Sequence, residues 1–116
     1  MKVGIPRTIR AGVVVGNVYL EKNLSGDDGY KACYNKRTNE LLVDADIESG
    51  LRDRSFLHEV VHMIDENYGC GLGEEDTSRL ANGFLEFLWQ LGIELDWADI
   101  EAERLFEKGK NIKGGK

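Results

Sequence analysis

The sequence predicts an α+β fold in which a small antiparallel sheet with a hairpin is followed by three helices. Two observations predict this order. Before Asp46, β-branched and aromatic residues lie between groups of turn residues, which is typical of short strands. After Asp46, apolar residues recur at helical spacing. With 116 residues the chain has the size of one hydrophobic core, so we expect one domain over residues 1–107 and a basic, flexible tail over residues 108–116.

The first half of the chain predicts three strands. Residues 8–20 are rich in β-branched residues and predict one strand, with a bulge at a glycine. Residues 23–29 consist of turn formers. Residues 30–34 and 40–44 predict the two strands of a β-hairpin, which the polar residues 36–39 connect. We expect the strand over residues 40–44 to be an exposed edge of the sheet.

The second half predicts three helices. The first ends at Gly69 and carries apolar residues around most of its circumference, which indicates that it is mostly buried. The second runs from about residue 74 to residue 91, where Gly92 ends it, and Asp96 caps a third that extends to about Phe106. The second helix has an apolar stripe that we expect to face the core: Thr77, Leu80, Ala81, Phe84, Leu85, Leu88 and Leu91.

Charge and composition exclude several classes of protein. Residues 48–107 carry 4 basic and 15 acidic side chains, a net charge of −11, whereas nucleic acid is bound by basic faces. No apolar run approaches the roughly 18 residues that span a bilayer, and the first residues lack the apolar core of a signal peptide. Two cysteines, Cys33 and Cys70, are too few for a disulfide scaffold. We therefore expect a cytoplasmic protein that binds neither nucleic acid nor membrane.

The candidate chemistry centres on the two histidines of the chain. His58 and His62 are four residues apart with Glu59 between them, in the pattern H-E-x-x-H. On a helix, positions i and i+4 share one face, so both imidazoles can bind one tetrahedral zinc ion. Glu59 lies about 100° around the helix from His58, where it can take a proton from a metal-bound water. The other interpretation of the motif is two core histidines beside a surface glutamate.

A catalytic zinc site needs a third protein ligand. No histidine follows His62, so a glutamate on the next helix is the other common choice. We favour Glu74, because it is in phase with the apolar stripe of that helix. Glu75, in phase with polar residues, is the first alternative, and Cys70 is the second. Asp65 lies on the same face of the motif helix and is a candidate to accept an N–H from a ligand imidazole.

Three runs of residues together resemble a known family: His58-Glu59-Val60-Val61-His62-Met63-Ile64-Asp65, Leu72-Gly73-Glu74-Glu75 and Arg79-Leu80-Ala81-Asn82-Gly83-Phe84. They are similar to short single-domain metallopeptidase-like proteins of phages and prophages, related to the gluzincin branch and to the ImmA/IrrE-like proteins. The resemblance implies a minimal zincin-like fold in which a hairpin precedes the motif helix. It also implies zinc ligands at His58, His62 and Glu74, with Glu59 as general base.

These observations predict a zinc-dependent metallopeptidase that hydrolyses a peptide bond through a metal-activated water. Zinc lowers the pKa of its water, Glu59 accepts the proton and passes it to the leaving amine, and a protein or peptide is the substrate. The ligand set suits zinc (Zn²⁺) best, with iron, manganese and cobalt as alternatives. The alternative function is a non-catalytic, metal-binding interaction or regulatory protein of phage origin, and the third is a structural domain with a coincidental motif. The substrate and the oligomeric state stay open at this point.

Overall fold

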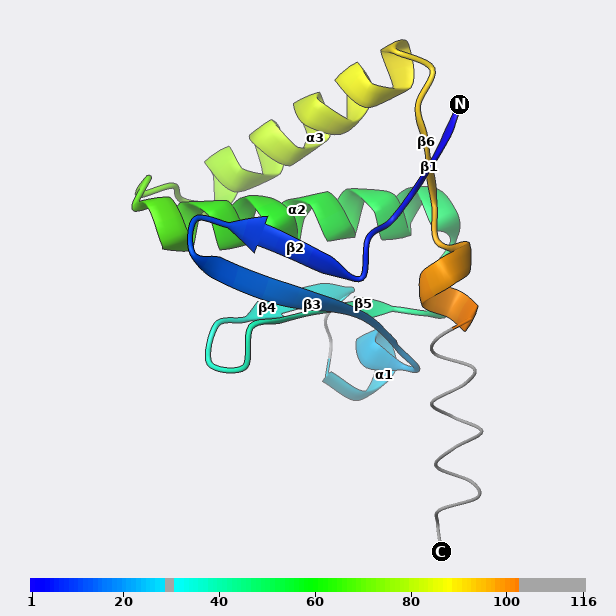
Figure 1. Ribbon diagram of the computed structural model, residues 1–116, viewed down its shortest axis with the longest axis horizontal. Coiled ribbons are helices and arrows are strands. Elements are labelled where there is room, and N and C mark those ends of the chain that lie inside the picture. Colours follow the sequence, from blue (N-terminus) through cyan, green and yellow to red (C-terminus); the bar gives the residue numbers. More distant parts are fainter. Residues whose placement is uncertain (29–30, 103–116) are drawn as a thin grey trace, which may run out of the picture.

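The computed structural model describes residues 1–28 and 31–102 and confirms the predicted α+β class (Figure 1). A further helix begins at Ala98 and is described as far as Ala102. The rest of the predicted third helix, to about Phe106, and the predicted tail over residues 108–116 lie outside the described residues. The elements in chain order are β1 (Lys2–Gly4), β2 (Thr8–Ala11), β3 (Val14–Glu21), α1 (Leu24–Asp28), β4 (Ala32–Asn35), β5 (Glu40–Asp44), α2 (Ser49–Tyr68), α3 (Glu74–Gln90) and β6 (Glu94–Asp96).

The main sheet has four strands in the order β2-β3-β5-β4, and it is mixed rather than antiparallel as predicted. β2 pairs with β3, and β4 with β5, in antiparallel fashion, but β3 and β5 run parallel. The reason is that α1 and β4 return the chain to the end of the sheet where β3 begins. β5 then runs beside β3 in the same direction.

Two strand predictions are corrected by this topology. The predicted single strand over residues 8–20 is a pair of strands, because the chain reverses at Gly12. Its φ of 64° is a left-handed conformation that glycine adopts without strain. The predicted edge strand over residues 40–44 is β5, which lies between β3 and β4 and is therefore central. The edges of the sheet are β2 and β4.

A second, two-stranded sheet joins segments that are far apart in the sequence. β1 pairs in parallel with β6, from Lys2 opposite Glu94 to Gly4 opposite Asp96. No local pattern predicts this pairing, because three residues per strand give no periodic signal. β6 leads to Trp97, which is 4% exposed and lies in the core. The Asp96 carboxylate accepts the N–H of Ala98 at 3.0 Å, where the last helix begins.

α2 packs against the sheet through Phe56 and Met63, which are seven residues apart and so lie on one side of the helix. Met63 is fully buried, as is Leu41 of β5. Gly16 of β3 permits this contact, since a Cβ there would lie 2.9 Å from Leu41 Cδ1 and 3.1 Å from Met63 Cε. A Cβ at position 16 would therefore displace the buried side-chain ends of Leu41 and Met63, and glycine allows β3 to approach Met63 of α2 closely.

α3 diverges from α2 (Figure 1), and its predicted apolar stripe is only partly buried. One side of the stripe is buried: Thr77, Ala81 and Leu85. The other side is exposed by 53%, 58% and 56% at Leu80, Phe84 and Leu91. α2 is likewise buried on one side only, since Ile64 and Tyr68 are 41% and 64% exposed. The helical spacing of apolar residues identifies an apolar face, but the angle between the two helices decides how much of that face is buried.

Asp44, at the end of β5, is a buried carboxylate that fixes the neighbouring loops. Its Oδ2 accepts the backbone N–H of Ser25 at 2.9 Å, and its Oδ1 accepts that of Asp46 at 2.8 Å. Burial alone would raise the pKa of Asp44, but hydrogen bonds from Ser25 and Asp46 and the charge of Arg52 hold this pKa below its ordinary value. The ionised carboxylate therefore stabilises the folded state.

We predict that Gly16→Ala destabilises the fold. Its methyl group meets Leu41 and Met63 in the packed core, and such overpacking lowers the free energy of unfolding by about 1–3 kcal/mol. Urea unfolding followed by circular dichroism measures this change. Gly4→Ala is the matched control, because a Cβ there meets nothing within 4 Å, and it should change stability by less than about 0.5 kcal/mol. Equal stability of the two variants would contradict the close approach of β3 to α2.

We predict that Asp44→Asn lowers the free energy of unfolding by about 1–3 kcal/mol at pH 7, because an amide NH₂ must then face one of the two N–H donors. A carboxyl pKa that is lower in the folded state stabilises the protein above the unfolded pKa, near 3.8, and this contribution is lost as the pH falls through the folded pKa. The difference between native protein and variant should therefore shrink on acidification below that value. Urea unfolding at pH 7 and in increasingly acidic buffers measures this difference in the free energy of unfolding. A difference that does not change with pH would contradict the stabilising role of the ionised Asp44 carboxylate.

Candidate metal centre

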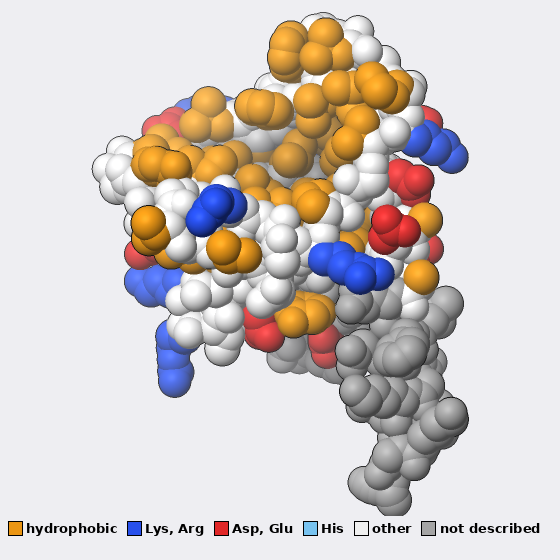
Figure 2. Space-filling model, viewed as in Figure 1, with side chains coloured by type: hydrophobic (Ala, Val, Ile, Leu, Met, Phe, Trp, Pro, Cys, Tyr) orange, Lys and Arg blue, Asp and Glu red, His pale blue; other side chains and the backbone are white. Residues whose placement is uncertain are grey.

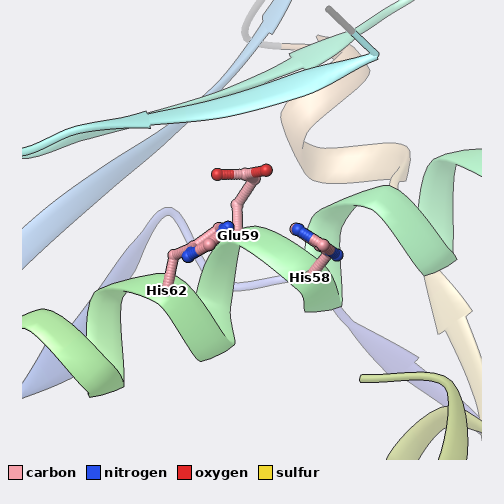
Figure 3. A group of neighbouring side chains, drawn as sticks. All are labelled: His58, Glu59 and His62. Carbon is pink, nitrogen blue, oxygen red and sulfur yellow. The ribbon is translucent and has the colours of Figure 1, made fainter. Parts of the chain in front are cut away.

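His58 and His62 extend from the same side of α2, one turn apart (Figure 3). Their ring centroids are 4.7 Å apart, and the ring planes are inclined by 70°. The two side chains are 19% and 30% exposed, so both are accessible without projecting freely into solvent. Met63, the next residue, is fully buried against the sheet. The histidine face therefore lies at the border between the core and the surface.

Glu74, the first residue of α3, reaches both imidazoles. Its Oε2 lies 2.7 Å from Nε2 of His58, and its Oε1 lies 3.1 Å from Nε2 of His62. Two ring nitrogens from one helix and one carboxylate from the next therefore meet at one place. The helical phase that favours Glu74 in the sequence agrees with this position.

The loop between α2 and α3 is held by Asp65. The backbone carbonyl of Asp65 accepts the N–H groups of Gly69 at 2.9 Å and of Cys70 at 3.3 Å. Its carboxylate Oδ1 accepts the N–H of Leu72 at 3.1 Å. Asp65, expected to orient an imidazole, instead binds the loop that leads to Glu74. It acts on the site by placing the start of α3.

The two alternative third ligands have other surroundings. Glu75 Oε1 pairs with Arg79 Nη2 at 3.3 Å on the exposed surface of α3. Cys70 is an exposed free cysteine in the loop between the helices. Glu74, by contrast, has a carboxylate oxygen against each imidazole. The geometry therefore favours Glu74 as the third ligand.

Glu59 lies between the two histidines in the sequence but points from α2 toward the sheet (Figure 3). Its Oε1 accepts the backbone N–H of Tyr34 in β4 at 2.9 Å. Burial raises the pKa of Glu59, against the opposing effects of His62, His58 and the Tyr34 N–H. Ligand atoms of His58, Glu59 and His62 lie within 4.8 Å of one another, so Glu59 is also close enough to share an ion. Glu59 is thus held by the strand, whereas Glu74 has an oxygen beside each ring nitrogen.

Ser78 contacts the site and was not predicted. Its Oγ lies 3.3 Å from Nδ1 of His58, on the ring edge opposite the nitrogen that faces Glu74. A hydrogen bond to the second ring nitrogen fixes the tautomer and orientation of a metal-binding histidine. Ser78 follows Glu74 by four residues and so shares its side of α3. That spacing is the signal that could have identified it.

The donor set fits a zinc ion. Two imidazole nitrogens and one glutamate oxygen form a known set of catalytic zinc ligands. Ligands that are about 2.0–2.1 Å from a tetrahedral ion are about 3.4 Å from one another. The nitrogen–oxygen separations of 2.7 and 3.1 Å are hydrogen-bond lengths, so the Glu74 carboxylate would have to move away from the imidazoles to hold an ion with them. Three protein ligands leave a fourth position for solvent or substrate.

An open groove of about 510 Å³ borders these residues. It lies between β4 and α2, and its lining is Ala32, Cys33, Tyr34, Lys36, Glu59, His62, Asp65, Glu66 and Glu74. Lys36 and Glu66 pair across it at 3.2 Å. β4 is an edge strand, and the N–H of Tyr34 donates to Glu59 rather than to β5. Alternate backbone groups of β4 therefore face the groove.

The comparisons with known proteins give no relative: no protein-family model, no curated protein and no solved structure matches the chain. Among the helices of residues 1–28 and 31–102, none combines the length and apolar character needed to cross a membrane. Fold and site together define an α+β protein with a candidate centre of two histidines and one glutamate. The resemblance noted in the motif helix stays a prediction.

We predict that Glu74→Gln and Glu75→Gln differ sharply in zinc affinity. Partners that only orient a ligand already contribute about 10–100-fold to metal affinity, so loss of a direct ligand in Glu74→Gln should cost more than about 100-fold. Glu75→Gln removes the same charge one residue away and breaks only the ion pair with Arg79. It should bind zinc as the native protein does. Competition with a chromophoric chelator measures both affinities, and equal values would reject Glu74 as a ligand.

Proposed function

We propose that this protein is a zinc-dependent metallopeptidase, and one observation carries the proposal. The Glu74 carboxylate lies between the Nε2 atoms of His58 and His62, with one oxygen on each. Core histidines, the competing interpretation of the motif, would be buried among apolar residues. Both histidines are part-exposed and share one carboxylate, and His62 lines an open groove. The arrangement supports a metal site more than a structural one.

The chemistry is divided between the ion and the chain. When bound, zinc supplies Lewis acidity, which polarises a carbonyl group and makes water more acidic. Glu59 supplies the base: it accepts the proton of the attacking water and then delivers it to the leaving amine. The Tyr34 N–H orients the Glu59 carboxylate.

The groove supports an extended peptide as the substrate. β4 is an edge of the sheet and lines the groove with Ala32, Cys33 and Tyr34. An edge strand can bind an extended peptide as an additional strand. β4 therefore takes the role that the sequence analysis gave to residues 40–44. Such binding places a peptide carbonyl beside Glu59 and the two imidazoles.

We also propose a cytoplasmic location and a place among the gluzincin-like proteins of phages. The relation to gluzincin-like proteins is supported by three features: the H-E-x-x-H helix, the β4–β5 hairpin before it and the glutamate at the start of α3. Neither Cys33 nor Cys70 is part of a disulfide, which suits a reducing compartment and so supports the cytoplasmic location.

We predict that Glu59→Gln binds zinc as the native protein does but loses hydrolysis. Loss of a general acid–base group lowers turnover by about 10²–10⁴-fold. Elemental analysis after dialysis should find about one zinc per chain in both proteins, with His62→Ala as the zinc-free control. Cleavage of casein and of a fluorogenic peptide library measures turnover. Glu86→Gln, an exposed glutamate of α3, is the matched control and should keep full activity.

The outcomes separate the competing functions. Full turnover by Glu59→Gln with zinc bound would contradict the proposed role of Glu59. One zinc per chain without cleavage of any probe by the native protein would favour the metal-binding regulatory protein. Absence of zinc from the native protein, even after zinc is added and excess removed, would favour two structural histidines.

A further inference from the structure

α3 has two apolar sides, and within residues 1–28 and 31–102 one of them is largely exposed. Thr77, Ala81 and Leu85 are buried on the side that faces α2. A second row is exposed by 53%, 58%, 53% and 56%, and it consists of Leu80, Phe84 and Phe87 of α3 and the residue that caps its C-terminus, Leu91. At 100° per residue, this row spans about 60° of the helix circumference and lies about 90° from the buried side.

The spacing of the row is that of a helix–helix seam. Steps of four, three and four residues separate its members, which is the alternation of the two apolar positions in a coiled coil. Single exposed apolar residues are common on protein surfaces. A row at this spacing on one helix indicates a second helix packed along it. Figure 2 shows apolar side chains gathered along α3 and around the hollow beside it.

The exposed area matches what a dimer needs. With about 200 Å² for a large apolar side chain, the four residues expose roughly 450 Å². A standard interface buries about 800 Å² on each partner, of which roughly 500 Å² is apolar in homodimers. α3 alone therefore supplies most of the apolar area that a stable pair of copies requires.

We propose that the partner is a second copy of this chain and that the two α3 helices pack antiparallel. The row reads leucine, phenylalanine, phenylalanine, leucine, so a two-fold axis between its middle members makes it self-complementary. Phe84 then packs against Phe87 of the other copy, and Leu80 against Leu91. A parallel pair would instead bring together two acidic helix starts, each with Glu74, Glu75 and Asp76.

The proposed dimer leaves the candidate metal centre open. Glu74 contacts His58 and His62 of α2 and therefore lies on the side of α3 that faces α2. The groove is lined by β4, α2 and the start of α3, and contains none of the four row residues. The inference stands independently of the proposed catalytic function.

Sedimentation equilibrium of the full chain tests the proposal. We expect twice the chain mass of 13.0 kDa, with dissociation on dilution. Phe84→Glu and Leu91→Glu should each weaken association by about 30-fold or more. Both residues are exposed in the single chain, so circular dichroism should report an unchanged fold. Tyr19→Glu is the matched control, because Tyr19 is 38% exposed on β3, away from α3, and it should remain dimeric.

Mixing two variants tests the antiparallel arrangement. In an antiparallel pair of Phe84→Glu with Phe87→Lys, the new glutamate faces the new lysine, and the remaining phenylalanines face each other. We expect each variant alone to be monomeric and their equimolar mixture to recover the dimer mass. A monomeric native protein, or equal dissociation by Phe84→Glu and Tyr19→Glu, would overturn the dimer. A mixture that stays monomeric would overturn the antiparallel register.

Discussion

The burial of Met63 between α2 and the sheet is the contact on which the candidate site depends. Rotation of a helix about its axis decides which residues face each neighbour, and Met63 allows α2 little freedom to rotate. It is fully buried beside Gly16 and Leu41, and turning it away would open a cavity in a close-packed core. His62 precedes it in the sequence, so the same contact directs the histidines toward α3. The hydrogen bond from Tyr34 to Glu59 ties the strand to the helix at a second point.

Much of the site could be predicted because its parts are related by local geometry. One helix fixes the relation between His58, Glu59 and His62, and no knowledge of the tertiary structure is needed to place them on neighbouring sides of it. Glu74 could be chosen because the phase of the next helix distinguishes it from Glu75. The contacts of Ser78 and Tyr34 arise from how α3 and β4 approach α2. The contact of Ser78 could have been predicted from its spacing of four residues from Glu74. No pattern in the sequence predicts the contact of Tyr34.

The errors concern relations between elements rather than the elements themselves. β5 has the predicted bounds but a central position, since the order of strands depends on how α1 and β4 return the chain. The pairing of β1 with β6 joins distant segments that are too short to show a pattern. On α3, periodicity cannot separate Leu85, which α2 covers, from Phe84, which it leaves exposed. Each case was decided by a neighbour that is remote in the sequence.

The position of Trp97 and Ile100 in the core has a consequence for the order in which the chain can complete its fold. Trp97 packs edge-on against Phe56 of α2 and donates from Nε1 to Asp53 at 2.7 Å. Synthesis proceeds from the N-terminus, so all the proposed ligands leave the ribosome before the residues that complete the core around α2. A nascent chain that ends within α3 would carry the full ligand set on an unfinished scaffold. Trp97 and Ile100 therefore join the core around α2 only after the proposed ligands have left the ribosome.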